Sequence, residues 1–307
     1  MTIARLSILL LALVTGGCFG GAAGPEPPPL AALEQDLRDK GHRALLSGDV
    51  ARAGLFFDEA RRLAESIDDR PGLAGALNDL GAVAGLHGDL GKAAEFHRRA
   101  HGIALELGDR ALIAASLSYR GQAAHLMGDH SAALAFYTQA LALAREVSDR
   151  RGEAVVLNNL GLLQQAKGEA DQAEQSFQRA LALNTELGEQ RAMASNLSNL
   201  GALSEKRGRW AEARSLYEQA LALDKETEQR PAIEADLVNL GQLSEVEHRL
   251  EEAISYYDRA YRGYRVLNQV PKAVDVLTRL IRVVKAAGQE TLAAAYQAEL
   301  NTLTKKP

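Results

Sequence analysis

One cysteine and seven histidines are the residues in this chain that could support thiol, metal or nucleophilic chemistry. His97 and His101 lie four residues apart, a spacing that places both imidazoles on one face of a helix and would suit a metal pair. His97, however, occupies a position that holds Phe or Tyr in the other complete repeats described below, which favours a packing role. The spacing of the remaining histidines indicates no Ser-His-Asp arrangement. The sequence therefore predicts no catalytic, cofactor or metal site.

Cys18 follows a segment that is unlike the rest of the chain. Arg5 is followed by the apolar run Leu6–Val14 and then by small residues. This order is typical of a secretory signal peptide. The nine apolar residues are too few to cross a bilayer, which needs about 20. We therefore expect residues 1–17 to be a cleaved signal peptide.

The stretch Val14-Thr-Gly-Gly-Cys18 resembles the lipobox of bacterial lipoproteins. This resemblance implies that Cys18 becomes the first mature residue and carries lipid. Phe19 stands where an aspartate would imply retention at the inner membrane, so the resemblance favours a lipid-anchored protein of the outer membrane that faces the periplasm. The alternative is an ordinary signal peptide with a chance cysteine. Residues 18–33 are then the lipidated cysteine and a linker, since Gly20–Pro29 is rich in glycine and proline.

The composition of the chain excludes two classes of protein. Its 307 residues carry a formal charge of −5, with 47 % hydrophobic and 24 % charged residues. This apolar content permits a large core and excludes a disordered chain. The acidic balance argues against a nucleic-acid partner. The glycines are spread singly, so no phosphate-binding loop is indicated.

Residues 34–307 repeat with a period of 40 residues. Two glycine columns, two alanine columns and one aromatic column recur over six rows without an insertion, except that His248 replaces the second glycine in the sixth row and Gly288 restores it in the seventh. Self-similarity at such a period is the signature of an array of small supersecondary units. The columns are Gly41, Gly81, Gly121, Gly161, Gly201 and Gly241; Gly48, Gly88, Gly128, Gly168 and Gly208; Ala53, Ala93, Ala133, Ala173, Ala213, Ala253 and Ala293; Phe57, His97, Tyr137, Phe177, Tyr217 and Tyr257; Ala60, Ala100, Ala140, Ala180, Ala220 and Ala260.

These columns predict a hairpin of two helices in each row. Leu157 and Leu160 have the apolar spacing of an amphipathic helix. A glycine inside a helix costs about 1 kcal/mol relative to alanine, so the first glycine column indicates close contact with a neighbouring helix. The second glycine column lies between two helical patterns and indicates the turn of the hairpin. The alanine columns would let the second helix pack closely, with the aromatic column filling the space above them.

The spacing of Leu-Gly, alanine, aromatic residue and alanine resembles the tetratricopeptide repeat, over about residues 34–307. Its period and its Asn-Leu-Gly sequence resemble the 40-residue, long-helix subtype found in kinesin light chains and in many bacterial proteins. The resemblance implies an all-α solenoid of helix-turn-helix repeats that forms a right-handed superhelix with a concave groove. In the seventh row Ile281 replaces glycine and Gln297 replaces the aromatic residue. We therefore expect six full repeats and a degenerate C-terminal cap at residues 274–307.

The same resemblance places partner contacts on the first helix of each repeat, where Asn-Leu-Gly asparagines line the groove. Asn159, Asn199 and Asn239 hold that position here. An asparagine amide both donates and accepts, so a ladder of them can pair with the backbone of an extended peptide. The alternative is that these amides satisfy neighbouring helices or face water. The other predicted groove residues are Asn78, Asp79, Tyr119, Gln122, Asn158, Glu205, Gln242 and Glu245, and the two glutamates suggest a ligand with some basic character.

Tyr261 and Tyr264 belong to a group of four tyrosines near the C-terminus. Tyrosine is enriched at interfaces, so these two side chains could form a second partner patch. The equally supported alternative is that they seal the joint between the last full repeat and the cap.

The sequence therefore predicts a non-enzymatic scaffold or adaptor that binds a protein or an extended peptide and is held at the bacterial cell envelope by a lipid anchor alone. A cytoplasmic repeat regulator that senses a signalling peptide is the alternative, and an enzyme with an unrecognised site is a third. The partner, the envelope process and the oligomeric state stay open.

Overall fold

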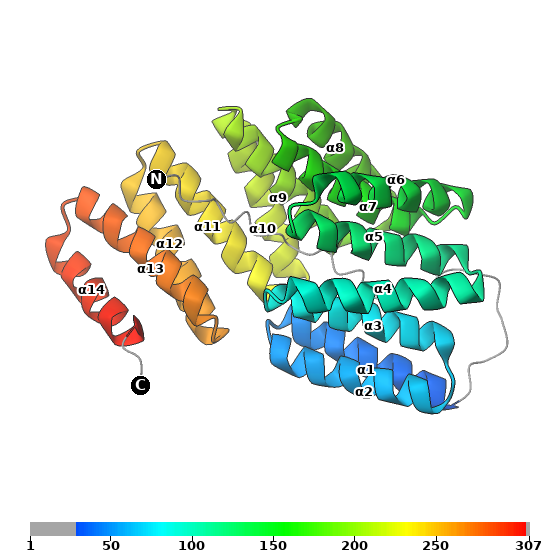
Figure 1. Cartoon of the computed structure of the whole chain (residues 1–307). Helices are drawn as coiled ribbons and strands as arrows, with labels where there is room; N and C mark the ends of the chain where they lie inside the picture. Colours follow the sequence, from blue (N-terminus) through cyan, green and yellow to red (C-terminus); the bar gives the residue numbers. More distant parts are fainter. Residues whose placement is uncertain (1–28, 305–307) are drawn as a thin grey trace. The chain divides into compact units, whose positions relative to one another are not determined.

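The computed structural model describes residues 29–304, and this part of the chain is entirely helical (Figure 1). No strand occurs in it, which confirms the predicted all-α class. The predicted signal peptide, Cys18 and most of the predicted linker lie outside the described residues. The helices of this part are α1 (Pro29–Leu46), α2 (Val50–Ser66), α3 (Arg70–Leu86), α4 (Leu90–Leu107), α5 (Arg110–Leu126), α6 (His130–Glu146), α7 (Arg150–Lys167), α8 (Ala170–Leu187), α9 (Gln190–Lys206), α10 (Trp210–Glu226), α11 (Arg230–Val246), α12 (Leu250–Val266), α13 (Val270–Ala286) and α14 (Glu290–Thr304).

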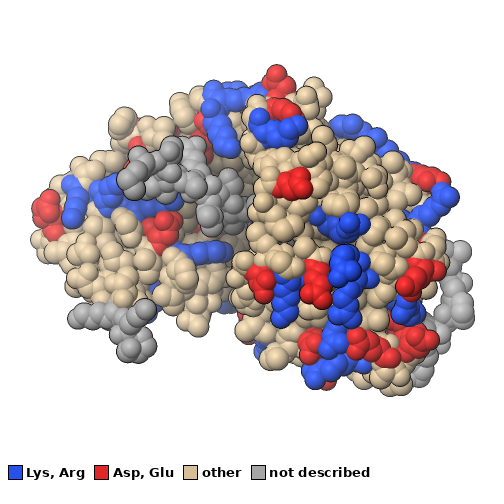
Figure 2. Space-filling view, viewed as in Figure 1, with Lys and Arg blue, Asp and Glu red and all other residues tan. Residues whose placement is uncertain are grey.

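The helices group into two compact units. The first contains α1–α8 and ends at Gly188, and the second contains α9–α14 and begins at Glu189. Within each unit every helix packs against the helices before and after it in the chain. Contacts also join successive first helices of the hairpins, α1 to α3, α3 to α5, α5 to α7, and α9 to α11. The arrangement is a solenoid of helical hairpins, with basic and acidic side chains interspersed over its surface (Figure 2).

Each hairpin carries local signals that start and stop its helices. An aspartate precedes each of α2–α7 and caps it: the Asp49 carboxylate accepts from the Arg52 N–H, and the Asp149 carboxylate accepts from the Gly152 N–H. Such caps satisfy backbone donors that the first helical turn leaves unpaired. At the turn, Gly128 has φ +82°, a conformation that glycine adopts without strain. The second glycine column is therefore the hairpin turn, as predicted.

The first glycine column packs directly against the aromatic column. A Cβ atom at Gly161 would lie 2.5 Å from Cε1 of Phe177, and one at Gly121 would lie 2.6 Å from Cδ1 of Tyr137. Packed interiors leave no room at such distances, so only glycine permits this approach of the two helices. The expected close contact is confirmed, and the ring of the following helix is what the glycine accommodates. The other pairs are Gly41–Phe57, Gly81–His97, Gly201–Tyr217 and Gly241–Tyr257.

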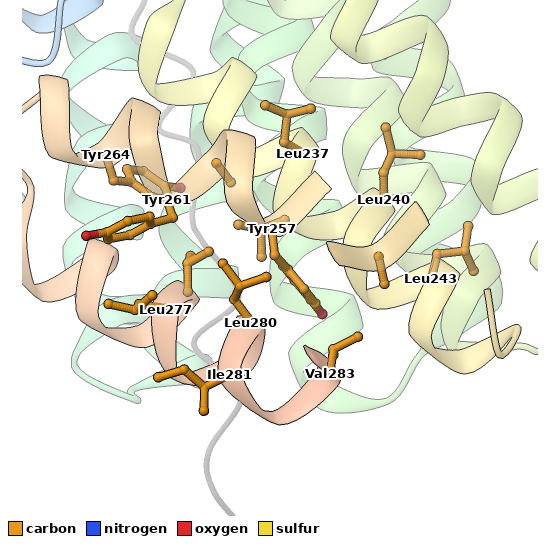
Figure 3. Packing of buried hydrophobic residues seen from close by; sticks show 14 of the residues in the cluster. Leu237, Leu240, Leu243, Tyr257, Tyr261, Tyr264, Leu277, Leu280, Ile281 and Val283 are labelled. Carbon is orange, nitrogen blue, oxygen red and sulfur yellow. The ribbon is translucent and has the colours of Figure 1, made fainter. Parts of the chain in front are cut away.

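The last hairpin, α13 and α14, has a different interior. α13 contributes Leu277, Leu280 and Ile281 to a core that it shares with α11 and α12 (Figure 3). α14 adds Ala293 to this core, with Tyr296 packed against it. The glycine-to-ring contact of the other rows is thus replaced by branched aliphatic side chains.

The N-terminal helix begins earlier than the sequence pattern indicated. α1 starts at Pro29, whereas the array was expected to start at residue 34. Proline is tolerated in the first turn of a helix because its missing N–H has no partner there in any case. The end of the proline run therefore belongs to the helix rather than to the linker. None of the helices within residues 29–304 has the length and apolar character needed to span a membrane.

Candidate functional site

The predicted partner residues lie on α3, α5, α7, α9 and α11, the first helices of their hairpins. Their exposure differs between the two units. Those of α1–α8 are buried, except for the half-buried Tyr119, whereas those of α9–α14 are all half-buried and reach solvent. The buried ones are Asn78, Asp79, Gln122, Asn158 and Asn159; the half-buried ones of the second unit are Asn199, Glu205, Asn239, Gln242 and Glu245.

Asp79 forms a buried ion pair with the first helix of the array. The Arg38 Nε donates to Asp79 Oδ2 at 2.7 Å, and His42 Nε2 lies 3.5 Å from Asp79 Oδ1. Glu34 lies on the same side of α1, and burial raises its pKa to about 7, with Arg38 acting in the opposite direction. The carboxylate of Asp79 therefore connects α1 to α3.

Tyr119 and Asn78 both contact the imidazole of His97. The rings of His97 and Tyr119 are stacked, with their centroids 5.1 Å apart, and His97 Nδ1 lies 3.3 Å from Asn78 Oδ1. Burial raises the pKa of the Tyr119 hydroxyl, and the charge of Asp79 adds to the effect. These side chains join α3, α4 and α5 in one polar network.

Asn159 connects two successive first helices. Its Nδ2 donates to Ser118 Oγ of α5 at 3.4 Å. Asn159 and Ser118 are 41 residues apart, and so are Arg38 and Asp79, which join the earlier pair of first helices. This contact supports, for Asn159, the alternative in which the amide satisfies a neighbouring helix.

Glu205 and Glu245 are held in place by rings of the aromatic column. The Tyr217 hydroxyl donates to Glu205 Oε2 at 3.0 Å, and the Tyr257 hydroxyl donates to Glu245 Oε2 at 3.2 Å. Glu245 is also within 2.9 Å of Arg282 Nη2 of α13. The sequence contains a signal for this arrangement, because each tyrosine follows its glutamate by 12 residues. The two carboxylates are thus fixed, half-buried acceptors on α9 and α11.

Tyr261 and Tyr264 lie in the core of the second unit, 3 % and 1 % exposed (Figure 3). Their rings lie near Leu277 and Leu280 of α13. They are packing residues of the joint between α12 and α13, and they do not form an exposed patch.

A buried pair of carboxyl groups, Asp224 of α10 and Asp236 of α11, was not anticipated from the sequence. The Ser198 hydroxyl donates to Asp236 Oδ1 at 2.5 Å, and Gln229 donates to Asp224. Burial raises the pKa of Asp224 to about 7; burial and the neighbouring Asp224 hold the pKa of Asp236 well above its ordinary value. Two adjacent carboxyl groups cannot both ionise easily, so one of the pair keeps its proton near neutral pH. In an earlier row Ala64 stands at the position of Asp224, and Ala76 stands at the position of Asp236. An acidic residue that replaces such an alanine is the sequence feature by which the pair could be found.

This pair makes stability depend on pH. Because the folded-state pKa values are raised, the native chain holds more protons than the unfolded chain above about pH 4, and its free energy of unfolding falls as pH rises through 7. Asp236→Asn can still accept from Ser198 and can donate to Asp224, so we expect the variant to be more stable than the wild type by about 2 kcal/mol at pH 8 and by much less at pH 5. Urea unfolding and hydrogen exchange of α10 and α11 at both pH values measure the difference. Asp275→Asn, at an exposed carboxylate, is the matched control, and equal gains at pH 5 and pH 8 would contradict the shared proton.

The two histidines considered for a metal pair have separate partners. His101 Nδ1 bonds to Ser116 Oγ at 2.9 Å, whereas His97 contacts Asn78 and Tyr119. Within the described residues, no group of three or more His, Cys, Asp and Glu side chains is arranged to hold a metal ion. His97 is 2 % exposed and takes the place of the ring in its row.

A tetratricopeptide repeat family model matches the chain over residues 107–186 and 190–266. No curated protein matches the chain by sequence. The matched ranges cover α5–α8 and α9–α12, four consecutive hairpins of the two units.

Solved structures of other proteins share the fold. BtubC (BKLC) from P. vanneervenii is 25 % identical, with a TM-score of 0.56, covering 76 % of this chain and 92 % of that one. A Rap protein complexed with Competence and Sporulation Factor is 16 % identical, with a TM-score of 0.64, covering 88 % and 74 %. Aspartyl phosphate phosphatase F from Bacillus subtilis is 15 % identical, with a TM-score of 0.61, covering 90 % and 71 %.

Proposed function

The chain belongs to the tetratricopeptide repeat family, and from this we propose that it is a protein- or peptide-binding scaffold or adaptor, anchored by lipid on Cys18 in the bacterial cell envelope. It performs no chemistry of its own in this proposal. Its partner is a protein or an extended peptide that lies along the first helices of the hairpins.

The observation that carries the proposal is the row of half-buried polar side chains on α9 and α11. Glu205 and Glu245 are oriented by tyrosine hydroxyls, so little conformational entropy is lost when they accept bonds from a ligand. Asn199 and Asn239 lie at the position that resembles the peptide-contacting asparagines of related repeats. Carboxylates interspersed with amides suit an extended segment with basic side chains.

Partner binding is tested with the double variant Asn199→Ala and Asn239→Ala. A partner is first captured from native envelope by cross-linking, identified by mass spectrometry, and then titrated against the purified variants. Loss of two hydrogen bonds at about 0.5–1.5 kcal/mol each weakens binding by at least about fivefold. The control is Gln178→Ala and Gln219→Ala, two exposed positions on second helices. Unchanged affinity of the double variant, with its thermal midpoint preserved, would sink the proposal.

The lipid anchor is tested separately by intact-mass analysis of the protein from its native host, beside Cys18→Ala. We expect a chain that begins at Cys18 and carries diacylglycerol and acyl mass. One thioether-linked chain alone holds a protein only marginally on a bilayer, so several chains are needed for a stable anchor. A mature chain cut nearby without lipid would instead indicate a soluble exported binder.

The alternative function is a cytoplasmic regulator that senses a peptide, and the fold shared with a Rap protein complexed with Competence and Sporulation Factor favours it. An intact, unmodified chain beginning at Met1 would support this alternative. The similarity to the phosphatase concerns the fold only, at 15 % identity.

The non-enzymatic part of the proposal can be tested on its own. Hydrolysis of an aspartyl phosphate by the purified chain would contradict it.

A further inference from the structure

Two arginines of neighbouring helices face each other at the α4–α5 junction. The register is set by two contacts: the stacked rings of His97 and Tyr119, and the hydrogen bond between His101 and Ser116. The helices run antiparallel, since the later residue on α4 meets the earlier residue on α5. One turn back along α4 from His101 is Arg98, and one turn forward along α5 from Ser116 is Arg120. Arg98 and Arg120 therefore lie at the same level of the α4–α5 pair.

Arg120 departs from the leucine that most rows hold at this position. Five rows hold Leu80, Leu160, Leu200, Leu240 and Leu280 in this column, and the first row holds Lys40. Here the Arg120 guanidinium lies over the Phe136 ring, with Cζ 4.2 Å from the centroid. Burial, and then the charge of Arg98, lower the pKa of Arg120. A charged side chain at a position that is leucine in most rows breaks a local rule, and such departures are expected at functional positions.

No acid neutralises this pair within residues 29–304. The adjacent Arg99 pairs with Glu65, but neither Arg98 nor Arg120 forms an ion pair with a carboxylate in the described residues. In Figure 2 both basic and acidic side chains lie on the surface over α4 and α5. Like charges held at one level of a helix junction repel, and a bound anion would remove the repulsion.

The neighbouring His101 is already held by a hydrogen bond across the junction. The Ser116 hydroxyl donates to the Ile113 carbonyl, so it accepts from the His101 Nδ1–H, which leaves Nε2 without a partner within residues 29–304. Beside it, a Cβ atom at Gly102 would meet no other heavy atom within 4 Å. Arg98, His101 and Gly102 share one face of α4, so the guanidinium of Arg98 has open space beside it.

We propose that the junction of Arg98 and Arg120 binds a phosphate-type oxyanion. Two guanidinium groups from different helices offer two separate pairs of donors, which a tetrahedral oxyanion can accept on different edges. A carboxylate has only two oxygens and fills one such pair. The ligand is either free phosphate or the phosphoryl group of a phosphomonoester, since both present the same oxygens.

The proposal is tested by titrating inorganic phosphate and, separately, O-phosphoserine into the purified protein at constant ionic strength. Calorimetry and the thermal midpoint are the readouts. Saturable binding and a raised midpoint are expected for the wild type, whereas Arg120→Leu should weaken binding at least about tenfold. Without ligand, Arg120→Leu should melt higher than the wild type, because it restores the leucine of the other rows and removes the repulsion.

Two further variants keep the outcome decisive. Arg98→Gln, at an exposed side chain, should weaken binding without disturbing the fold. Arg52→Leu is the matched control, since the Arg52 Cζ lies 5.5 Å from the centroid of Phe56, which holds the position of Phe136 two rows earlier. This variant should bind like the wild type. Tighter binding of O-phosphoserine would identify a phosphorylated ligand, and equal or weaker binding would identify free phosphate. Equal binding by wild type, Arg120→Leu and Arg98→Gln, or none by the wild type, would overturn the proposal.

Discussion

Gly161→Ile is expected to destabilise the chain by about 3 kcal/mol or more, because the position has no space for a side chain. Even a single Cβ atom would lie 2.5 Å from the Phe177 ring, which is fully buried. The ring is held from its other side by the packed core and cannot move away. The strain must therefore separate α7 from α8. Urea unfolding monitored by circular dichroism measures the loss.

The seventh row indicates how this loss can be recovered. There isoleucine and glutamine, Ile281 and Gln297, replace the glycine and the ring together. We expect Gly161→Ile with Phe177→Gln to be less destabilised than the sum of the two single variants, by about 2 kcal/mol. Gly85→Ala is the control, since its Cβ atom would have only ordinary contact with Leu126, and it should stabilise α3 slightly. Strict additivity of the two changes would show that the glycine and the ring do not compete for one space.

Much of this fold could be predicted from the sequence because similar helix-start, turn and packing residues recur from one repeat to the next. Alanines at fixed phase recur in every row, glycine stands at the turn in most rows, and aspartate precedes each of α2–α7, so the structure predicted for one row applies to the next. The pairing of Gly161 with Phe177 was harder to predict. Both columns were visible, but their contact depends on the angle between two helices, which the spacing along the chain does not contain.

The candidate site was predicted less completely, because its contacts join different rows. Arg38 and Asp79 are 41 residues apart, and their ion pair turns a residue expected to meet a ligand into one that holds α1 to α3. Asp224 and Asp236 occupy columns whose residue types vary from row to row, from Ala64 and Ala76 to Asn184 and Asn196, so the repeat pattern gave them no role. Arg120, which departs from the leucine of its column, has contacts that the column pattern does not predict.

His97→Phe should make the chain more resistant to acid. His97 stands in the aromatic column beneath Gly81, and its imidazole is 2 % exposed. Burial lowers its pKa to about 4, and the charge of Asp79 acts in the opposite direction. The folded protein therefore keeps this imidazole neutral at pH values where the unfolded chain protonates it. A phenyl ring fills the same place, as Phe57 and Phe177 do, and has no proton to take up.

The sign and size of the effect follow from the two pKa values. Below about pH 6.5 the unfolded chain binds a proton that the folded chain does not, so the contribution of His97 to stability is present above that pH and is lost as pH falls to about 4. One pKa unit corresponds to about 1.4 kcal/mol, so the free energy of unfolding of the wild type falls by about 3 kcal/mol over this pH interval through His97. The His97→Phe variant does not have this loss. At pH 7 the two should be close, since the variant loses the contact with Asn78 and gains apolar packing.

Urea unfolding of the wild type and of His97→Phe at pH 7, 5.5 and 4 measures the gap directly. Taking the difference at each pH matters, because Glu34 and Asp224 have raised pKa values and shift the stability of both proteins in the opposite direction. His97→Tyr, which reproduces Tyr137 of the next row, should follow the phenylalanine variant. If the gap stays constant from pH 7 to pH 4, His97 is not a buried neutral imidazole in the folded chain, and its stacking on Tyr119 would need another explanation.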